Sequence, residues 1–191
     1  MSEFFTVDRA GKLNLGDEIN IDHDYDAKNF FPVKDIFTKD NLKTLVGELF
    51  PNGLAEHGKN YLLDQNIIIQ DNLGNKTIYV PNNPMIEIIF ELVRRLEFPT
   101  KPSRFQSVFG WETYEQAENF KKNLCQGRGA ILKIAGENYH KFDMNLLFLG
   151  GSTIGSLMFS RKYWRGEQGV NPNWEILLKP PVRVIEVIEN Y

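Results

Sequence analysis

The end of the chain carries two short apolar segments separated by a pair of prolines, and this arrangement limits what the chain can fold into. Residues 176–178 are Ile-Leu-Leu, and residues 182–187 are rich in valine, as β-strands are. Pro180 and Pro181 lack a backbone N–H and punctuate the two segments. The sequence therefore predicts a terminal β-hairpin, with Glu175 at the head of its first strand and at an end of the sheet.

Length and composition indicate an ordinary globular protein. The 191 residues suffice for one full hydrophobic core, so we expect a single domain over 1–191. The net charge of −3 argues against broad, nonspecific binding to phosphate backbones, which requires clustered Lys and Arg. Cys125 is the one cysteine of the sequence, which excludes an internal disulfide. With no apolar run of about 18 residues, the chain is expected to be cytoplasmic, neither exported nor inserted in a membrane.

Hydrophobic periodicity predicts both helices and strands. Apolar residues at spacings of three and four indicate helices over 33–50, 83–96, 113–120 and 152–164. Short apolar or β-branched runs indicate extended segments over 4–7, 13–21, 61–69, 76–80, 107–111 and 130–134. The predicted fold class is α+β, and the pair 61–69 and 76–80 is expected to form a hairpin inside an insertion at about 22–80.

Several polar residues are expected to start or support these helices. Residues 38–40 suit an N-cap region, and Thr113 with Gln116 three residues later fits a capping box. On the helix over 83–96, Glu91 and Arg95 are one turn apart, and we expect them on its outer side as a stabilising ion pair.

The sequence gives little support for a metal site or a phosphate-binding loop. The three histidines are isolated in sequence, and no spacing typical of zinc ligands occurs. Residues 22–26 are acidic but lack the glycine and terminal glutamate of a calcium loop. The glycine-rich residues 149–155 lack the Lys-Ser/Thr end of a P-loop, so we interpret them as a loop in which Ser152 or Thr153 caps the next helix.

Two segments combine positive charge with aromatic rings. In one, Arg104 offers two donors for a phosphate or carboxylate beside the stacking face of Phe105, although a helix-to-strand linker explains this segment equally well. In the other, residues 161–165 place Arg and Lys around Tyr163 and a tryptophan. A solvated helix face with one inward aromatic is the preferred interpretation of residues 161–165, with a nucleotide or nucleic-acid contact as the alternative.

The order of several motifs resembles that of an uncharacterised bacterial and phage family whose members are similar to ADP-ribosyltransferases. The resemblance covers most of the chain apart from residues 22–80. It rests on Thr6-Val7, residues 11–16, residues 91–94 running into Phe98-Pro99, residues 102–109, Glu115-Gln116-Ala117, Tyr163-Trp164-Arg165-Gly166 and the strand led by Glu175. It implies an ADP-ribosyltransferase-like split, mostly antiparallel sheet with peripheral helices.

The same resemblance implies a site and a cofactor. Glu175 would take the place of the transferase glutamate, which fixes a ribose hydroxyl of NAD and stabilises an oxocarbenium-like centre as nicotinamide leaves. NAD would be the substrate that donates ADP-ribose to a host protein or nucleic acid. The residues expected to bind NAD are Thr6, Ser103, Arg104, Phe105, Ser107 and Tyr163.

Departures from the motif leave a second function open. Asn173 stands where arginine-modifying members often have a second glutamate, which disfavours arginine as the acceptor. Phe5 and Thr6 stand where the wider superfamily usually has Tyr-His or an Arg. The alternative is therefore a catalytically inactive member of the fold, in the host cytoplasm if phage-encoded, that binds or inhibits a host toxin of an ADP-ribosylation-based antiphage defence. A nucleotide or nucleic-acid binding module that uses Arg104 and residues 161–165 is the third hypothesis.

Overall fold

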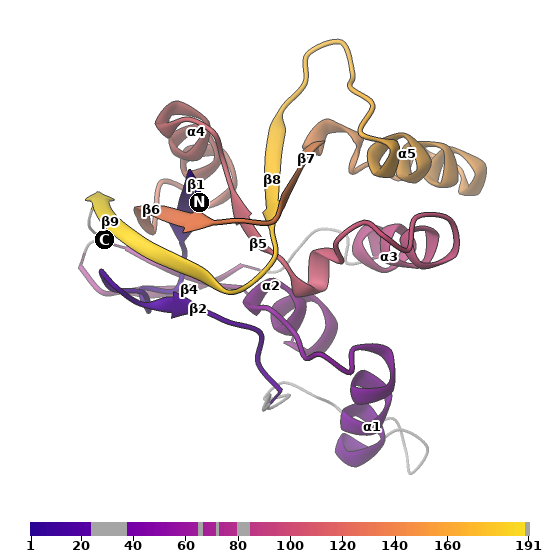
Figure 1. Cartoon of the computed structure of the whole chain (residues 1–191), viewed down its shortest axis with the longest axis horizontal. Helices are drawn as coiled ribbons and strands as arrows, with labels where there is room; N and C mark the ends of the chain where they lie inside the picture. The colour runs from indigo at the N-terminus through magenta and orange to yellow at the C-terminus, as the bar shows by residue number, and fades with distance from the viewer. Residues whose placement is uncertain (24–37, 65–66, 72, 80–84, 190–191) are drawn as a thin grey trace.

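The computed structural model describes residues 1–23, 38–64, 67–71, 73–79 and 85–189 (Figure 1). Its strands are β1 (Ser2–Asp8), β2 (Glu18–Ile19), β3 (Ile67–Gln70), β4 (Lys76–Tyr79), β5 (Val108–Gly110), β6 (Ala130–Gly136), β7 (Tyr139–Asp143), β8 (Trp174–Leu178) and β9 (Val182–Glu189). Its helices are α1 (Lys39–Leu49), α2 (Glu56–Gly58), α3 (Met85–Glu97), α4 (Tyr114–Leu124) and α5 (Thr153–Arg165), with short turns η1 (Lys59–Asp64), η2 (Arg104–Gln106) and η3 (Met144–Leu146). The predicted α+β class is confirmed.

The described strands form three antiparallel sheets. One has the order β1-β6-β9-β2, another the order β5-β8-β7, and the third is the hairpin β3-β4. Phe5 of β1 and Trp111, just after β5, exchange backbone hydrogen bonds of 2.8 and 2.7 Å. This bridge joins the edge of the four-stranded sheet to the edge of the three-stranded sheet, so both sheets contribute to one core.

The predicted terminal hairpin is wrong. β8 lies between β5 and β7, with Glu175 opposite Phe142, whereas β9 pairs with β6, with Val184 opposite Ile134. Four of the five β8 residues are buried, so this strand needs neighbours on both edges and layers on both faces. Pro180 and Pro181 have no N–H to continue a ladder, and the chain changes sheets there.

Helices α3 and α5 lie side by side at one end of the molecule (Figure 1). Trp164 of α5 donates its indole N–H to the carbonyl oxygen of Phe90 in α3 at 2.8 Å. The buried aromatic side chains of both helices pack on Phe142 and Leu177 of the β5-β8-β7 sheet. Ser152 caps the N-terminus of α5, as one of the two residues predicted for that role. These contacts hold Tyr163 of α5 directly over β8.

Residues of the expected insertion build the other wall of the core. Thr38 is the N-cap of α1, inside the predicted cap region, and β3 pairs with β4 as predicted. The extended segment expected over 61–69 is wrong in its first part, which belongs to the helical turn η1, because Tyr61 and Leu63 pack into the core beside Phe105. Gly58 ends α2 against η2, where an added Cβ would meet the carbonyl oxygen of Phe105 at 2.3 Å, so any larger residue would push these segments apart. This close approach brings His57 of α2 next to the η2 turn.

Several other expectations can be compared with the structure. The capping box of Thr113 and Gln116 is present at the start of α4. The extended segment expected over 13–21 contains only the two-residue strand β2. The acidic residues 24–26, the helix start expected at 33–37 and the one at 83–84 lie outside the described residues. Within the described part of the chain, no helix is both long and apolar enough to cross a membrane.

One buried carboxylate ties together several segments of the chain at the end of β7. Asp143, which is fully buried at the end of β7, accepts the backbone N–H groups of Asn145 at 3.0 Å, Gly169 at 2.8 Å and Asn173 at 2.8 Å. Asn173 directly precedes β8. Asp143 therefore ties the loop after α5 to the strand that carries Glu175.

Loss of this carboxylate is expected to destabilise the fold. A buried N–H without an acceptor costs about 1–3 kcal/mol, so Asp143→Ala should lower the free energy of unfolding by at least about 2 kcal/mol. Urea titration measures the change. The control is Asp17→Ala, which removes a carboxylate that accepts the backbone N–H of Asn14 in an exposed loop. Equal losses in the two variants would show that Asp143 does not organise the loop.

Candidate functional site

Four of the predicted site residues come together from three elements. Arg104 begins η2 and follows Ser103, Tyr163 lies on α5, and Glu175 lies on β8. The hydroxyl of Tyr163 donates to Oε1 of Glu175 at 2.6 Å, and it accepts from Nη1 of Arg104 at 2.7 Å. Nη1 of Arg104 also contacts Oε1 of Glu175 directly. Arg104, Tyr163 and Glu175 are each at most 5% exposed, so this cluster is closed to solvent.

Glu87 makes a two-point contact with Arg104, and sequence reasoning missed it. Oε2 of Glu87 in α3 accepts a hydrogen bond of 2.8 Å from Nε of Arg104, and its Oε1 accepts one of 3.0 Å from Nη2. Such a two-point contact fixes the plane of the guanidinium. Above the guanidinium, the ring of Phe109 lies with its centroid 4.8 Å from Cζ. Helical periodicity gave no signal for Glu87, because it lies on the side of α3 opposite the apolar residues Leu92 and Leu96.

His57 closes the cluster on the side of α2. Its Nε2 lies 3.2 Å from Oε1 of Glu87, but the contact lacks hydrogen-bond alignment. Its ring stacks on Tyr61 with centroids 4.2 Å apart and lies 4.5 Å from the ring of Phe109. In the sequence, His57 is isolated from other metal ligands. The residues that it contacts at the site are distant in sequence, so local patterns gave no signal for it.

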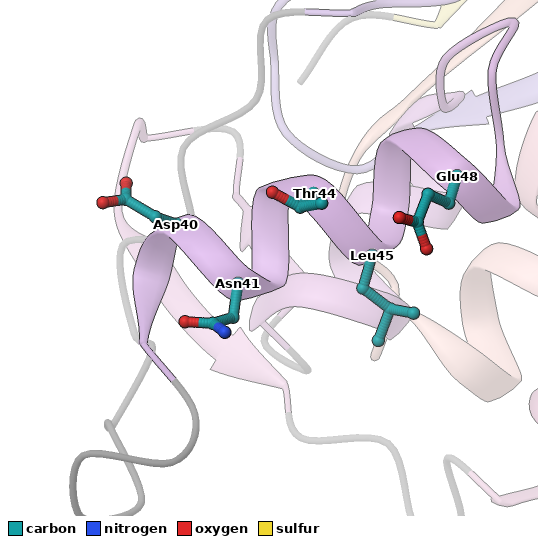
Figure 2. Close-up of a pocket in the computed structure, with 5 residues that line it drawn as sticks. All are labelled: Asp40, Asn41, Thr44, Leu45 and Glu48. Atoms are coloured by element: carbon teal, nitrogen blue, oxygen red, sulfur yellow. The ribbon is translucent and has the colours of Figure 1, made fainter.

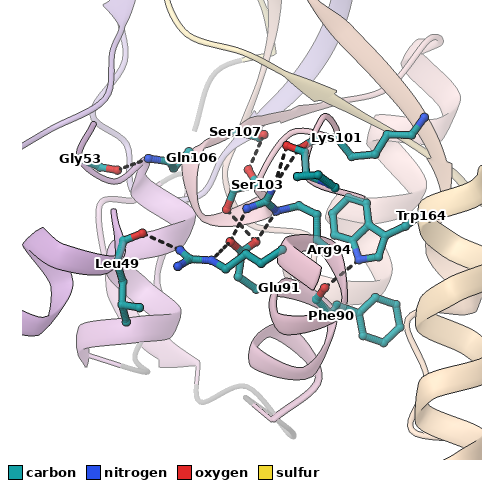
Figure 3. Close-up of polar contacts among 12 residues, drawn as sticks. Leu49, Gly53, Phe90, Glu91, Arg94, Lys101, Ser103, Gln106, Ser107 and Trp164 are labelled. Atoms are coloured by element: carbon teal, nitrogen blue, oxygen red, sulfur yellow. Dashed lines mark hydrogen bonds and ion pairs between the residues drawn. The ribbon is translucent and has the colours of Figure 1, made fainter. Parts of the chain in front are cut away.

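A second carboxylate of α3 holds the segment before η2 (Figure 3). Glu91 accepts hydrogen bonds from Nε and Nη2 of Arg94, at 2.9 and 2.8 Å. It also accepts one from Nε of Arg95 at 2.8 Å and one from the hydroxyl of Ser103 at 2.9 Å. The ion pair with Arg95 is confirmed, but the expected outer position of Glu91 is wrong, because its side chain is 2% exposed. Arg95 is 30% exposed and also donates to the carbonyl oxygen of Leu49 at the end of α1.

The other predicted residues lie around this cluster without joining it. The hydroxyl of Ser107 donates to the carbonyl oxygen of Ser103 at 2.7 Å. The ring of Phe105 is 1% exposed and packs edge-on against Phe50, 5.5 Å between centroids. The hydroxyl of Thr6 donates to the carbonyl oxygen of Phe109 at 2.7 Å and so links β1 to β5. Each of these side chains has a structural partner in this conformation.

A family model with the description "Protein of unknown function (DUF2441)" matches residues 4–190. The chain belongs to this DUF2441 family. The match includes every residue of the buried cluster and of both large sheets apart from the first residues of β1. A comparison with curated proteins finds no match.

In this DUF2441 protein the two carboxylates of the cluster have opposite electrostatic environments. Burial raises the pKa of Glu87, but Arg104 and His57 outweigh burial, and its pKa lies well below the usual value. For Glu175, burial outweighs Arg104 and Tyr163, and its pKa is raised. Burial also lowers the pKa of His57, against the effect of Glu87. Glu87 is therefore the firmly ionised carboxylate, and Glu175 is the one that takes up a proton more readily.

Two further features of the protein lie apart from the cluster. A hollow of about 330 Å³ runs along α1 and is lined by Asp40, Asn41, Thr44, Leu45 and Glu48 (Figure 2). Arg161, from the basic segment 161–165, forms a two-point ion pair with Glu97 of α3, with contacts of 2.7 to 2.9 Å. Among the described residues, no group of three or more His, Cys, Asp or Glu is placed to hold a metal ion.

The lowered pKa of Glu87 makes a prediction about pH. A glutamate titrates near pH 4.3 in an unfolded chain, so Glu87 stabilises the fold above about that pH and loses this effect as the pH falls further. Glu87→Gln should therefore be less stable than the natural protein at neutral pH, and the difference should shrink below about pH 4. Urea titrations at several pH values measure it. A difference that is constant with pH would contradict the assignment.

Proposed function

We propose that this protein transfers ADP-ribose from NAD to a macromolecular acceptor, with Glu175 as the catalytic carboxylate. The observation that carries the proposal is the convergence of Arg104, Tyr163 and Glu175 from three separate elements on one buried polar cluster. Such a cluster costs stability compared with an apolar core of equal volume, which is typical of sites retained for function. The resemblance to ADP-ribosyltransferases indicates which reaction this cluster would catalyse.

The chemistry assigns a role to each group. When nicotinamide leaves, positive charge develops on the ribose ring, and the carboxylate of Glu175 would stabilise it. Tyr163 would keep this carboxylate oriented through the hydrogen bond of 2.6 Å between its hydroxyl and Oε1. Arg104 is the natural partner for a phosphate of NAD, because its guanidinium offers several donors in one plane. Ser103, Phe105, Ser107 and Thr6 would form the surrounding wall of the nucleotide site.

Binding of NAD by this route requires an exchange of contacts. Glu175 is 1% exposed, and its Oε1 atom contacts both Tyr163 and Arg104. A ribose hydroxyl would have to replace Arg104 at the carboxylate, and the adjoining elements would have to separate enough to admit the nucleotide. The proposed acceptor is a protein or nucleic acid, and the closed form would be the state before NAD binds.

The same burial favours a second candidate function. A carboxylate that already binds Tyr163 and Arg104 inside the core needs no ligand, and it serves equally well as an internal tie between β8, α5 and η2. In that case the protein is a catalytically inactive member of the fold that acts as a binding protein, for example as an inhibitor of a host toxin in an ADP-ribosylation-based defence. The transferase and the inactive binding protein differ in whether NAD binds at all.

Calorimetric titration with NAD, followed by an assay of nicotinamide release, separates the two functions. We expect saturable binding, and a loss of at least about 100-fold in the release rate for Glu175→Gln, as for removal of a group that stabilises transition-state charge. The matched control Glu112→Gln changes an exposed glutamate paired with Lys141 and should leave the rate unchanged. Absence of binding by the natural protein would reject the transferase and leave the binding protein. Equal rates with and without the Glu175 carboxylate would exclude a catalytic role for it.

A further inference from the structure

Arg104 has two carboxylate partners, and their hold on it is unequal. Glu87 receives two separate donors, Nε at 2.8 Å and Nη2 at 3.0 Å, one on each of its oxygens. Glu175 receives only Nη1, and that group also donates to the hydroxyl of Tyr163 at 2.7 Å. The two-point contact with Glu87 therefore fixes the plane of the guanidinium, whereas Glu175 is bound through one donor.

Glu87 is itself fixed from several sides. It lies one helical turn before Glu91, and these two buried carboxylates of α3 bind Arg104 and Ser103, which are adjacent in the chain. Nε2 of His57 in α2 lies 3.2 Å from Oε1 of Glu87. The clamp between α3 and residues 103–104 thus exists without any contribution from β8.

The consequences of breaking the two contacts differ. If the contact between Arg104 and Glu175 opens, the guanidinium is still neutralised by Glu87, and Glu175 still accepts the hydroxyl of Tyr163. If the contact with Glu87 opens, this buried carboxylate keeps His57 near it among the described residues but loses its ion pair, and the loss of a partner is costly in a buried ion pair. One guanidinium also neutralises only one of the two carboxylates, so Glu175 is the surplus one.

We infer that Glu87 is a positioning residue, which retains Arg104 while Glu175 exchanges its Arg104 contact for a hydroxyl group of the ligand. The identity of that ligand as the ribose of NAD rests on the proposed function. The unequal contacts of Glu87 and Glu175 with Arg104 do not rest on the proposed function, because they lie within this chain. Glu87 acts through Arg104 and is not assigned any contact with the reacting atoms.

The test observes the Nε–H group of Arg104 directly. Nitrogen-15 NMR of arginine side chains detects an Nε–H that is protected from exchange with water, and Arg104→Lys identifies the signal by its loss. We expect the protected signal to persist in Glu175→Gln and to be lost in Glu87→Gln. Arg94, whose Nε is held by Glu91, supplies an internal reference signal. A general loosening of the fold would weaken the signals of Arg94 and Arg104 alike, and it would not distinguish the two variants.

Each outcome decides the inference. Loss of the Arg104 signal in Glu175→Gln would overturn it, whether or not Glu87→Gln folds, and so would a signal that persists in a folded Glu87→Gln. Addition of NAD to the natural protein should leave the signal protected, and its loss on NAD binding would also overturn the inference. If calorimetry detects no NAD binding, the proposed function fails, while the comparison of the two variants still tests the hold of Glu87 on Arg104.

Discussion

The guanidinium of Arg104 is the group on which the arrangement of this protein depends. It lies between α3, α5 and β8 and is held by Glu87, Tyr163 and Glu175. A charge buried to this extent is tolerated only when its donors are satisfied with good geometry. The positions of the two helices relative to the three-stranded sheet are therefore coupled to one side chain in the short turn η2.

The segment that carries Arg104 is short, and its stability comes from neighbouring elements. Glu91 fixes Ser103, the hydroxyl of Ser107 binds the carbonyl oxygen of Ser103, and Gly58 lets α2 approach the backbone of Phe105. α2 and α1 belong to the region expected as an insertion. This region thus supplies His57 and part of the wall around the cluster, and it belongs to the core of the fold.

Parts of the fold that depend on local chemistry could be predicted from the sequence. The caps Thr38, Thr113 and Ser152 were found because a cap and its helix lie within a few residues of each other. The path of β8 and β9 could not be found in this way. A hairpin and a crossing between sheets have the same local pattern, and the choice depends on the pairing of β8 with β5 and β7, which are distant in sequence.

The site was predictable to the same extent and for the same reason. The motif order brought Ser103, Arg104, Tyr163 and Glu175 to attention, and these residues lie in or next to one cluster. Glu87 was missed because helical periodicity places it on the side of α3 opposite Leu92 and Leu96, and the fold buries this polar side. The burial of Glu91 has the same origin, since α3 contacts other elements on more than one side.

If this closed cluster is a ligand site, Arg104 stays with Glu87 while Glu175 is released. A crystal structure of the protein grown with saturating NAD would distinguish this exchange from an unchanged cluster. We expect NAD beside Glu175, a carboxylate that contacts the ribose in place of Arg104, and an unchanged contact between Arg104 and Glu87. Glu175 still bound to Arg104, with NAD absent or bound elsewhere on the surface, would show that the cluster is not a ligand site.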